Sequence, residues 1–396
     1  MALELEFDNH ELAFAARPRV AFVHGEGGDD SDAKAASLLL RLRADSEWTD
    51  NVSTVLELDY VALGWENEFT NGVNFNGKPV IPDSEGFDLN QALLSYSITN
   101  NLNLFIGREA VNLGNQRFVG TNSFWQNEQT LDMTGMQFGF GTASTISYRY
   151  VDNANRIQGE DAGTKLRSSD ANFIQQGGQR PPQFLGNHDH QTHLLFADVK
   201  EWDYSRVQTY FYRMHIDDAL ALSNNTLGAR YEYKGRIAYV RPIVNAEFAL
   251  QERPEIADNS SIRYLNIEVG FGYRSSQLTL NYELLDGNSN VSFVTPLASL
   301  HDFNGWADKF LLTPAGGLKD YSLQYIWRNN PWQIDARYHS FKAANGSGSY
   351  GDELDVDMSF NITRDSQLLL RYANFKASSP AYNDEERVFL QFLYGF

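Results

Sequence analysis

The chain has 396 residues, a formal net charge of -19 and no cysteine. The lack of cysteine excludes disulfides, zinc–thiolate sites and a thiol nucleophile, and the acidic balance argues against nucleic acid as a partner. No run of about 18 apolar residues occurs, which excludes a membrane-spanning helix. The 26 phenylalanines and 20 tyrosines nevertheless suit the aromatic girdles of a membrane β-barrel.

Segments in which apolar and polar residues alternate recur from Arg19 to the end of the chain. Alternation at every second position is typical of strands with two different faces. The expected strands cover residues 19–24, 37–48, 52–62, 89–98, 102–113, 131–140, 144–151, 194–202, 206–216, 227–233, 237–250, 262–274, 277–285, 318–328, 332–341, 353–362, 367–375 and 387–396. This pattern predicts about 18 strands, with 16 as the alternative count.

Short and long connections alternate along these strands. Tight turns such as Thr49-Asp50-Asn51 alternate with long polar segments such as residues 152–193. Bacterial barrels place short turns on the periplasmic side and long loops outside. We therefore predict one all-β domain over residues 1–396. It is an antiparallel up-and-down transmembrane barrel in the outer membrane of a Gram-negative bacterium. Four tryptophans adjoin short turns, where an aromatic belt is expected, namely Trp48, Trp202, Trp327 and Trp332.

The last ten residues, RVFLQFLYGF, are expected to close the barrel against the first strand near Arg19. One parity carries Val388, Leu390, Phe392 and Tyr394 and should face lipid and lipopolysaccharide, whereas Gln391 and Gly395 should face the lumen. The terminal Phe396 fits the carboxy-terminal aromatic that the barrel-assembly machinery reads.

Arginines share the parity opposite to the apolar residues, as expected for a wet lumen. We expect ten arginines along the solute path, namely Arg41, Arg43, Arg108, Arg117, Arg149, Arg213, Arg230, Arg241, Arg337 and Arg371. Arg108 shares its parity with Leu104 and Ile106, so it should lie beyond the apolar band or after a bulge. The arginines either guide anions or pair with wall carboxylates. Near-equal numbers of arginines and acids favour pairing for most of them.

Two stretches carry a family resemblance. Residues 107–132 read GREAVNLGNQRFVGTNSFWQNEQTLD, and residues 293–320 read FVTPLASLHDFNGWADKFLLTPAGGLKD. Together they resemble the alginate export family of outer-membrane barrels. This resemblance implies a conduit in which pore arginines attract the carboxylates of a polyuronate. The chain departs from that pattern at Phe124-Trp125, where the family usually has Trp-Arg, and at Arg108-Glu109, where it has Arg-Gln.

The same stretches offer aromatic rings beside amides, which suit stacking on a sugar and hydrogen bonding to it. The expected loop constriction or sugar contacts are Gln116, Trp125, Asn127, Gln129, Asp132, Phe303, Asn304, Trp306 and Asp308. The alternative is that these residues only pack the loops against the wall. That packing would itself set the diameter of a pore.

No catalytic motif is present, and no cofactor or metal is expected. The spacing of His188, His190 and His193 matches no standard metal site, and GDDSD could form at most a loose divalent-ion site. We expect a porin for passive diffusion of a hydrophilic solute, such as alginate or a related acidic oligosaccharide. The alternatives are a less selective porin for small solutes or cations, and a receptor or structural barrel with a closed lumen.

Overall fold

A computed structural model describes residues 3–7, 9–25, 32–166, 168, 170, 177–256, 261–288 and 290–396. The strands are β1 Leu3–Phe7, β2 His10–Gly25, β3 Asp32–Thr49, β4 Val52–Gly64, β5 Gly86–Thr99, β6 Leu102–Glu109, β7 Thr130–Phe140, β8 Ser144–Asn155, β9 Asn187–Trp202, β10 Ser205–Met214, β11 Asn224–Tyr233, β12 Val240–Glu252, β13 Ile262–Tyr273, β14 Ser276–Leu285, β15 Leu318–Asn329, β16 Trp332–Lys342, β17 Ser349–Asn361, β18 Ser366–Ala377 and β19 Glu385–Tyr394. Four short 3-10 helices lie in the loops, η1 Glu66–Glu68, η2 Pro182–Phe184, η3 Asp217–Leu222 and η4 Leu300–Asp302. In the described part of the chain, no helix is long and apolar enough to span a membrane.

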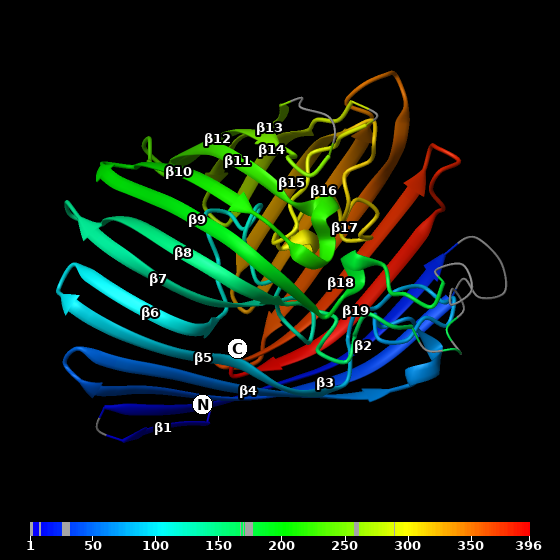
Figure 1. Ribbon diagram of the computed structural model, residues 1–396. Coiled ribbons are helices and arrows are strands. Elements are labelled where there is room, and N and C mark those ends of the chain that lie inside the picture. The colour runs from blue at the N-terminus through cyan, green and yellow to red at the C-terminus, as the bar shows by residue number, and fades with distance from the viewer. Residues whose placement is uncertain are drawn as a thin grey trace.

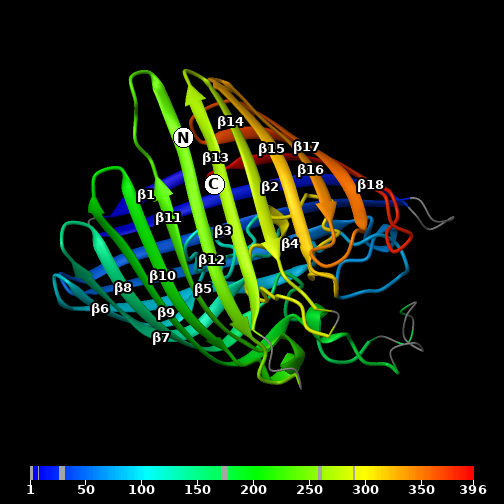
Figure 2. The ribbon, with the colours of Figure 1, turned by 90° about the horizontal axis from the view of Figure 1, so that it is seen from above.

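Strands β2 to β19 form a closed barrel of antiparallel neighbours (Figures 1 and 2). The last strand closes on the first, with Leu390 opposite Val20 and Gln391 opposite Arg19. Closure satisfies the backbone hydrogen bonds of both edge strands, which a membrane demands. The predicted 18-strand barrel and its closing pair are confirmed.

The N-terminal strand β1 was not predicted. It pairs with the part of β2 that β19 does not reach, with Leu3 opposite Phe14 and Phe7 opposite His10. The pairing of β19 with β2 stops at Ala16, opposite Tyr394. The two terminal strands therefore share one edge of β2, β19 along one part of it and β1 along the other.

Several boundaries differ from the predicted ones. β2 begins at His10 rather than Arg19, and β6 ends at Glu109 rather than Leu113. β9 begins at Asn187, so the three histidines placed in a loop by the sequence lie on a strand. β12 begins at Val240, after a turn in which Ala238 adopts a positive φ of 53°. Periodicity is weak at such ends because strands extend beyond the apolar band.

The two faces of the strands differ as the alternation predicts. On β3 and β4, Leu42 and Leu56 point outward and are 42% and 46% exposed, whereas Leu39 and Glu57 point inward and are buried. Trp48, Trp202 and Trp332 are exposed beside the short turns, as an interfacial belt requires. The apolar outer face and its belt identify the molecule as an outer-membrane type of barrel.

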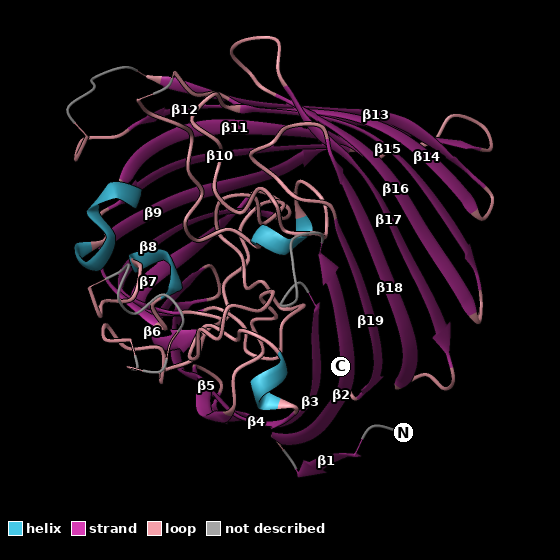
Figure 3. Ribbon diagram, turned by 90° about the vertical axis from the view of Figure 1, so that its right-hand side faces the viewer, coloured by secondary structure: helices cyan, strands magenta, loops and turns pink. Residues whose placement is uncertain are grey.

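The long loops fill the lumen at one end of the barrel, as the view along it shows (Figure 3). Phe118, Val119 and Leu297 come from loops and pack in one buried cluster with the wall residues Tyr264 and Phe341. Burial of each such large apolar side chain contributes about 1.5–3 kcal/mol. The main hydrophobic core of this barrel therefore lies inside the lumen, between loops and wall.

Candidate functional site: the divided lumen

Residues 122–129, which we call the partition segment, cross the lumen. Two arginines of β2 hold it in place. Arg17 donates from Nε to Gln126 Oε1 (2.9 Å) and from Nη1 to the Ser123 carbonyl (2.8 Å). Gln126 donates back to the Arg17 carbonyl (3.0 Å) and to Ser37 Oγ (2.8 Å). These reciprocal bonds are buried, so the segment is fixed to the wall.

Arg19 provides the second attachment. Its guanidinium contacts Asp83 (3.1 Å) and the Gln391 side chain (2.8 Å), and it also donates to the carbonyl of Phe124. Asp83 accepts the backbone N–H of Gln126 (3.0 Å) as well. Because Arg19 and Asp83 are both buried, losing either one would leave an unpaired charge inside the protein.

The partition segment belongs to the loop between β6 and β7, residues 110–129. A second loop, residues 286–317, packs directly on this first loop. Gln116 accepts a hydrogen bond from Ser299 Oγ (2.8 Å), and Gln129 donates to the Leu297 carbonyl (2.9 Å). A Cβ on Gly120 would lie 2.4 Å from Ser299 Oγ, so the close approach requires glycine. Gln116 itself has a positive φ of 70°, a strained conformation held by its contacts.

Arg117 and Asn304 join both loops to the barrel wall. Arg117 forms an ion pair with Glu283 of β14 (2.8 Å) and donates to Asn304 Oδ1 (2.8 Å). Its guanidinium also lies 4.7 Å from the centre of the Phe303 ring. Asn304 donates in turn to Asp320 Oδ2 (3.2 Å). Arg117 is 3% exposed, so it acts as an anchor rather than as a free binding group.

The turn that follows is held by acids of β17 and by Arg387. Glu353 accepts the backbone N–H of Ala307 (2.7 Å). Asp308 contacts His301 Nδ1 (2.9 Å) and Arg387 Nη1 (2.8 Å). Burial alone would raise the pKa of Asp308, but His301 and Arg387 together hold it below its usual value. Asp308 therefore stays ionised and keeps this loop attached.

Arg371 lies between two aromatic rings in the lumen. Its guanidinium carbon is 4.0 Å from the Trp306 ring centre and 4.2 Å from the Phe124 ring centre. It also contacts Asp357 at 2.6 and 2.8 Å. This arrangement fixes one ring from each loop against a wall arginine through cation–π contacts.

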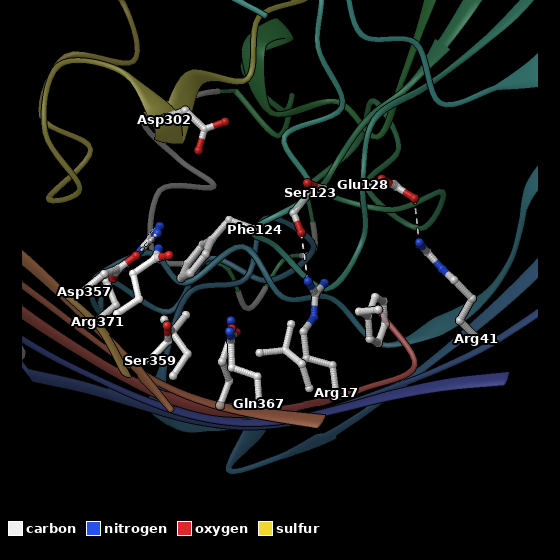
Figure 4. A pocket seen from close by; sticks show the side chains of 15 residues that line it. Arg17, Arg41, Ser123, Phe124, Glu128, Asp302, Asp357, Ser359, Gln367 and Arg371 are labelled. Atoms are coloured by element: carbon white, nitrogen blue, oxygen red, sulfur yellow. Dashed lines mark hydrogen bonds and ion pairs between the residues drawn. The ribbon is translucent and has the colours of Figure 1, made fainter. Parts of the chain in front are cut away.

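In the described part of the chain, an outer vestibule and two inner cavities lie between the loops and the wall. The outer vestibule holds about 540 Å³ among the long loops and is lined largely by apolar residues, with Arg156 and Arg117. The larger inner cavity, about 430 Å³, is lined by Arg17, Arg41, Phe124, Asp302, Arg371 and Phe396 among others (Figure 4). The smaller inner cavity, about 210 Å³, contains Glu268 and shares Asp302 with the larger one. The partition segment contributes Trp125 and Gln129 to the vestibule, and Phe124 and Glu128 to the larger inner cavity.

Most of the predicted path arginines are paired. Seven of the ten have a carboxylate within 4.0 Å, namely Arg41, Arg43, Arg108, Arg117, Arg230, Arg337 and Arg371. Among the others, Arg149 lies on the lumen face and stacks on Phe105 (5.1 Å). Arg241 has lumen parity at the periplasmic end of β12, where it donates to the Arg274 carbonyl (3.2 Å). Most of the ten predicted path arginines are therefore paired within the wall or attach loops to it, and are not free to bind an anion.

The charges that lack an opposite partner are few and differ in sign. Of the described cations lining these three cavities, Arg156 in the vestibule and Arg17 in the larger inner cavity have no carboxylate within 4.0 Å. Arg156 donates to the Pro296 carbonyl (2.5 Å). Asp302 is exposed, lines both inner cavities and has no cation within that distance in the described chain. In Figure 4 it stands apart from the Asp357–Arg371 pair.

Two predicted path arginines lie elsewhere. Arg213 shares the outward parity of β10 with Phe211, which is 43% exposed. Arg108 and its partner Asp132 (2.6 Å) share the outward face with Ile106, which is 58% exposed. The prediction that Arg108 and Arg213 line the solute path is wrong, and so is the placement of Asp132 at the loop constriction, because strand register puts their side chains on the outward face. Arg108 does lie at the end of its strand, as expected.

The other predicted loop residues gather at the partition. Trp125 is 2% exposed and packs on Phe389 and His301. Asn127 donates to Ser84 Oγ (2.8 Å). Of the predicted contact residues, Phe303 and Asn304 line the smaller inner cavity, and Asp308 and Gln129 line the vestibule. Trp306 is buried under Arg337 and Arg371.

The predicted lipid and lumen faces of the last strand are confirmed. The prediction that this strand continues to Phe396 is wrong. β19 stops at Tyr394, and Gly395 adopts a positive φ of 74°. Phe396 leaves the outward parity and lines the larger inner cavity. Its recognition by the assembly machinery remains a prediction.

One group of described acids comes close enough to hold a metal ion, namely Glu57, Asp59 and Glu128. Arg41 already contacts Asp59 (2.6 Å) and Glu128 (2.7 Å), and Arg43 contacts Glu57 (3.2 Å), so arginine side chains already pair with all three acids. The acidic GDDSD segment lies almost entirely outside the described residues.

Sequence reasoning missed Arg17, Arg19, Arg156 and Asp302. The two β2 arginines share parity with Ala15, Ala21 and Val23, so the alternation could have been extended back from Arg19 to find them. Arg156 and Asp302 follow no periodic pattern, because both lie in loops.

No protein-family model and no curated protein sequence matches the chain. Solved structures do match. OccAB4 of Acinetobacter baumannii has a TM-score of 0.73 and 11% identity, over 99% of this chain and 98% of that one. A BenF-like porin of Pseudomonas fluorescens Pf-5 has a TM-score of 0.71 and 11% identity, over 97% and 99%. The outer membrane protein OpdK of Pseudomonas aeruginosa, solved with vanillate, has a TM-score of 0.70 and 11% identity, over 97% and 98%.

These likenesses show the fold, which is that of outer-membrane porins. They do not support the alginate export family that the two loop stretches resemble. The FNGWADKF stretch instead has a structural reason, since its residues attach the second loop to Arg117, Glu353 and Arg387.

Proposed function

We propose that the protein is a channel for passive diffusion of small amphoteric solutes that carry one carboxylate and one amino group. The observation that carries this is the order of unpaired charges, with Arg156 in the vestibule and Asp302 in the inner cavities. A carboxylate would be drawn to Arg156, and an ammonium group would be drawn to Asp302 beyond the partition.

The cavity sizes support a small solute. The volumes of about 540 and 430 Å³ lie in the lower half of the usual range of small-molecule sites, and the volume of about 210 Å³ lies below it. The apolar lining of the vestibule suits a solute with some apolar surface. A neighbour of this fold was solved with vanillate, a small aromatic carboxylate, which is consistent with this size class.

An acidic oligosaccharide complements the charge of Arg156 but not the charge of Asp302. Its first carboxylate would be drawn to Arg156, but every further one would have to pass Asp302 and Glu268. The carboxylates of Asp302 and Glu268 would repel the carboxylates of such a solute and oppose its passage. We therefore propose amphoteric solutes in place of a polyuronate such as alginate.

Uptake into proteoliposomes tests the proposal. Serine, glycerate and serinol share a three-carbon skeleton and are zwitterionic, anionic and cationic near pH 7. We expect serine to enter severalfold faster than the other two, with protein-free liposomes as the control. Fastest entry of glycerate would restore the anion channel, fastest entry of serinol a cation porin, and no entry of any of them a closed lumen.

A further inference from the structure

The C-terminal residue turns from the barrel wall into the lumen. The Gly395 N–H donates to the Asp365 carbonyl (3.0 Å), and a Cβ at Gly395 would lie 2.4 Å from the Phe14 carbonyl oxygen. Only glycine fits this close, left-handed position. Phe396 then lies with its ring centre 5.1 Å from the Arg17 guanidinium carbon and 5.6 Å from that of Arg41.

The N-terminal strand explains why the chain turns. A longer β19 would continue to pair with β2 from Ala16 toward the start of β2. That part of the β2 edge, from Phe14 back to His10, is already paired with β1. Phe396 therefore has no backbone partner in the wall, and the turn at Gly395 directs it inward.

Among the described cations that line the inner cavities, the ring lies beside the one without a carboxylate within 4.0 Å, Arg17. The partners of Arg17 are the Gln126 side chain and the carbonyls of Ser123 and Trp125. The negative face of an aromatic ring attracts a guanidinium at this distance. Phe396 is 50% exposed, so its other side is open to the cavity.

We propose that Phe396 is a specificity-determining residue that screens Arg17 from solute. With Arg17 covered and Arg41 and Arg371 paired, Asp302 is the charge that a solute meets in the larger inner cavity. This inference rests on the proposed channel function. It states that the Phe396 ring, by covering Arg17, leaves the larger inner cavity with a net negative charge toward the solute.

The absence of native cysteine allows a direct test of position. Three single variants are refolded from denaturant into lipid vesicles, so that the assembly machinery is not needed. They are F396C, L393C as a lumen-facing reference, and F392C as a lipid-facing reference. A charged methanethiosulfonate reagent should modify F396C and L393C at similar rates and leave F392C largely unmodified by mass spectrometry. Labelling of F396C as slow as that of F392C would overturn the proposal.

A second variant tests the screening. F396L keeps an apolar C-terminal side chain and removes the ring face. Its anion-to-cation permeability ratio, measured from reversal potentials in a KCl gradient, should rise on the order of two- to fivefold. Adding R17Q to F396L should remove that rise, and an unchanged single-channel conductance would show that the partition segment stays in place without the bonds of Arg17. An unchanged ratio in F396L, or a rise that survives R17Q, would contradict the screening role.

These two tests separate the inference from the proposed function. The labelling pattern is read by mass spectrometry and needs no conductance. If wild type does not conduct while F396C labels as a lumen residue, the channel function fails and the position of Phe396 stands. The screening role then fails with the channel.

Discussion

The outer vestibule and the larger inner cavity share the partition segment as part of their lining, yet their unpaired charges differ in sign. The vestibule has apolar walls and an unpaired Arg156. The inner cavity has an unpaired Asp302, two arginines paired with carboxylates, and Arg17, which lies beside the Phe396 ring. Counting all charged residues in the lumen conceals this difference, because most of them neutralise one another across neighbouring strands. Selectivity is set by the few charges that no partner cancels.

Removing the partition should have the largest effect. R19A deletes one attachment of residues 122–129 and leaves the buried Asp83 unpaired, at a cost of about 3–5 kcal/mol. The loop should then leave the lumen, and single-channel conductance in a planar bilayer should increase severalfold. R206A is the matched control, since the ion-pair partners of this wall arginine, Asp198 and Glu232, both lie on strands of the barrel. Unchanged conductance of R19A would show that the loop is held without Arg19.

Neutralising the vestibule should have the next largest effect. Among the described cations that line the vestibule, R156Q removes the one without a carboxylate within 4.0 Å. Discrimination between serine and serinol in vesicle uptake should fall by roughly an order of magnitude or more, because a solute carboxylate about 4 Å from a half-buried guanidinium gains on the order of 1 to 4 kcal/mol. K234Q, a change at an exposed turn lysine, is the control. If R156Q discriminates as well as wild type, Arg156 is not the entry site.

Alkaline pH should mimic R156Q. Burial lowers the pKa of Arg156 to about 10, so its charge is complete at neutral pH and is lost as pH rises through that value. The preference for serine over serinol should also decline as the solute ammonium groups titrate, so chloride permeability is the cleaner measure. Chloride permeability should fall between about pH 9 and 11 in wild type. The fall should be smaller in R156Q, and equal falls would exclude Arg156 as the titrating group.

The smallest effect should follow from R213Q. Arg213 faces outward on β10, so the reversal potential in a KCl gradient should equal that of wild type within error. A shift as large as that of R156Q would place Arg213 in the ion path and contradict the register of β10.

The sequence predicts the architecture well because alternation, turns and aromatic belts follow directly from the barrel in lipid. It predicts the pairing of most wall arginines for the same reason. The predicted face of Arg213 was wrong because the alternation does not show which face a residue takes near the end of a strand. The sequence could not identify Asp302 or Arg156, since loop positions are set by packing between segments distant in the chain. The inward turn of Phe396 depends on β1, which has too few residues for its alternation to be recognised.

Arg156 and Asp302 should dominate opposite halves of one solute path. The reversal potentials of R156Q and D302N in the same KCl gradient distinguish their effects. We expect R156Q to shift permeability toward cations and D302N to shift it toward anions. Shifts of the same sign, or no shift in either variant, would contradict this expectation.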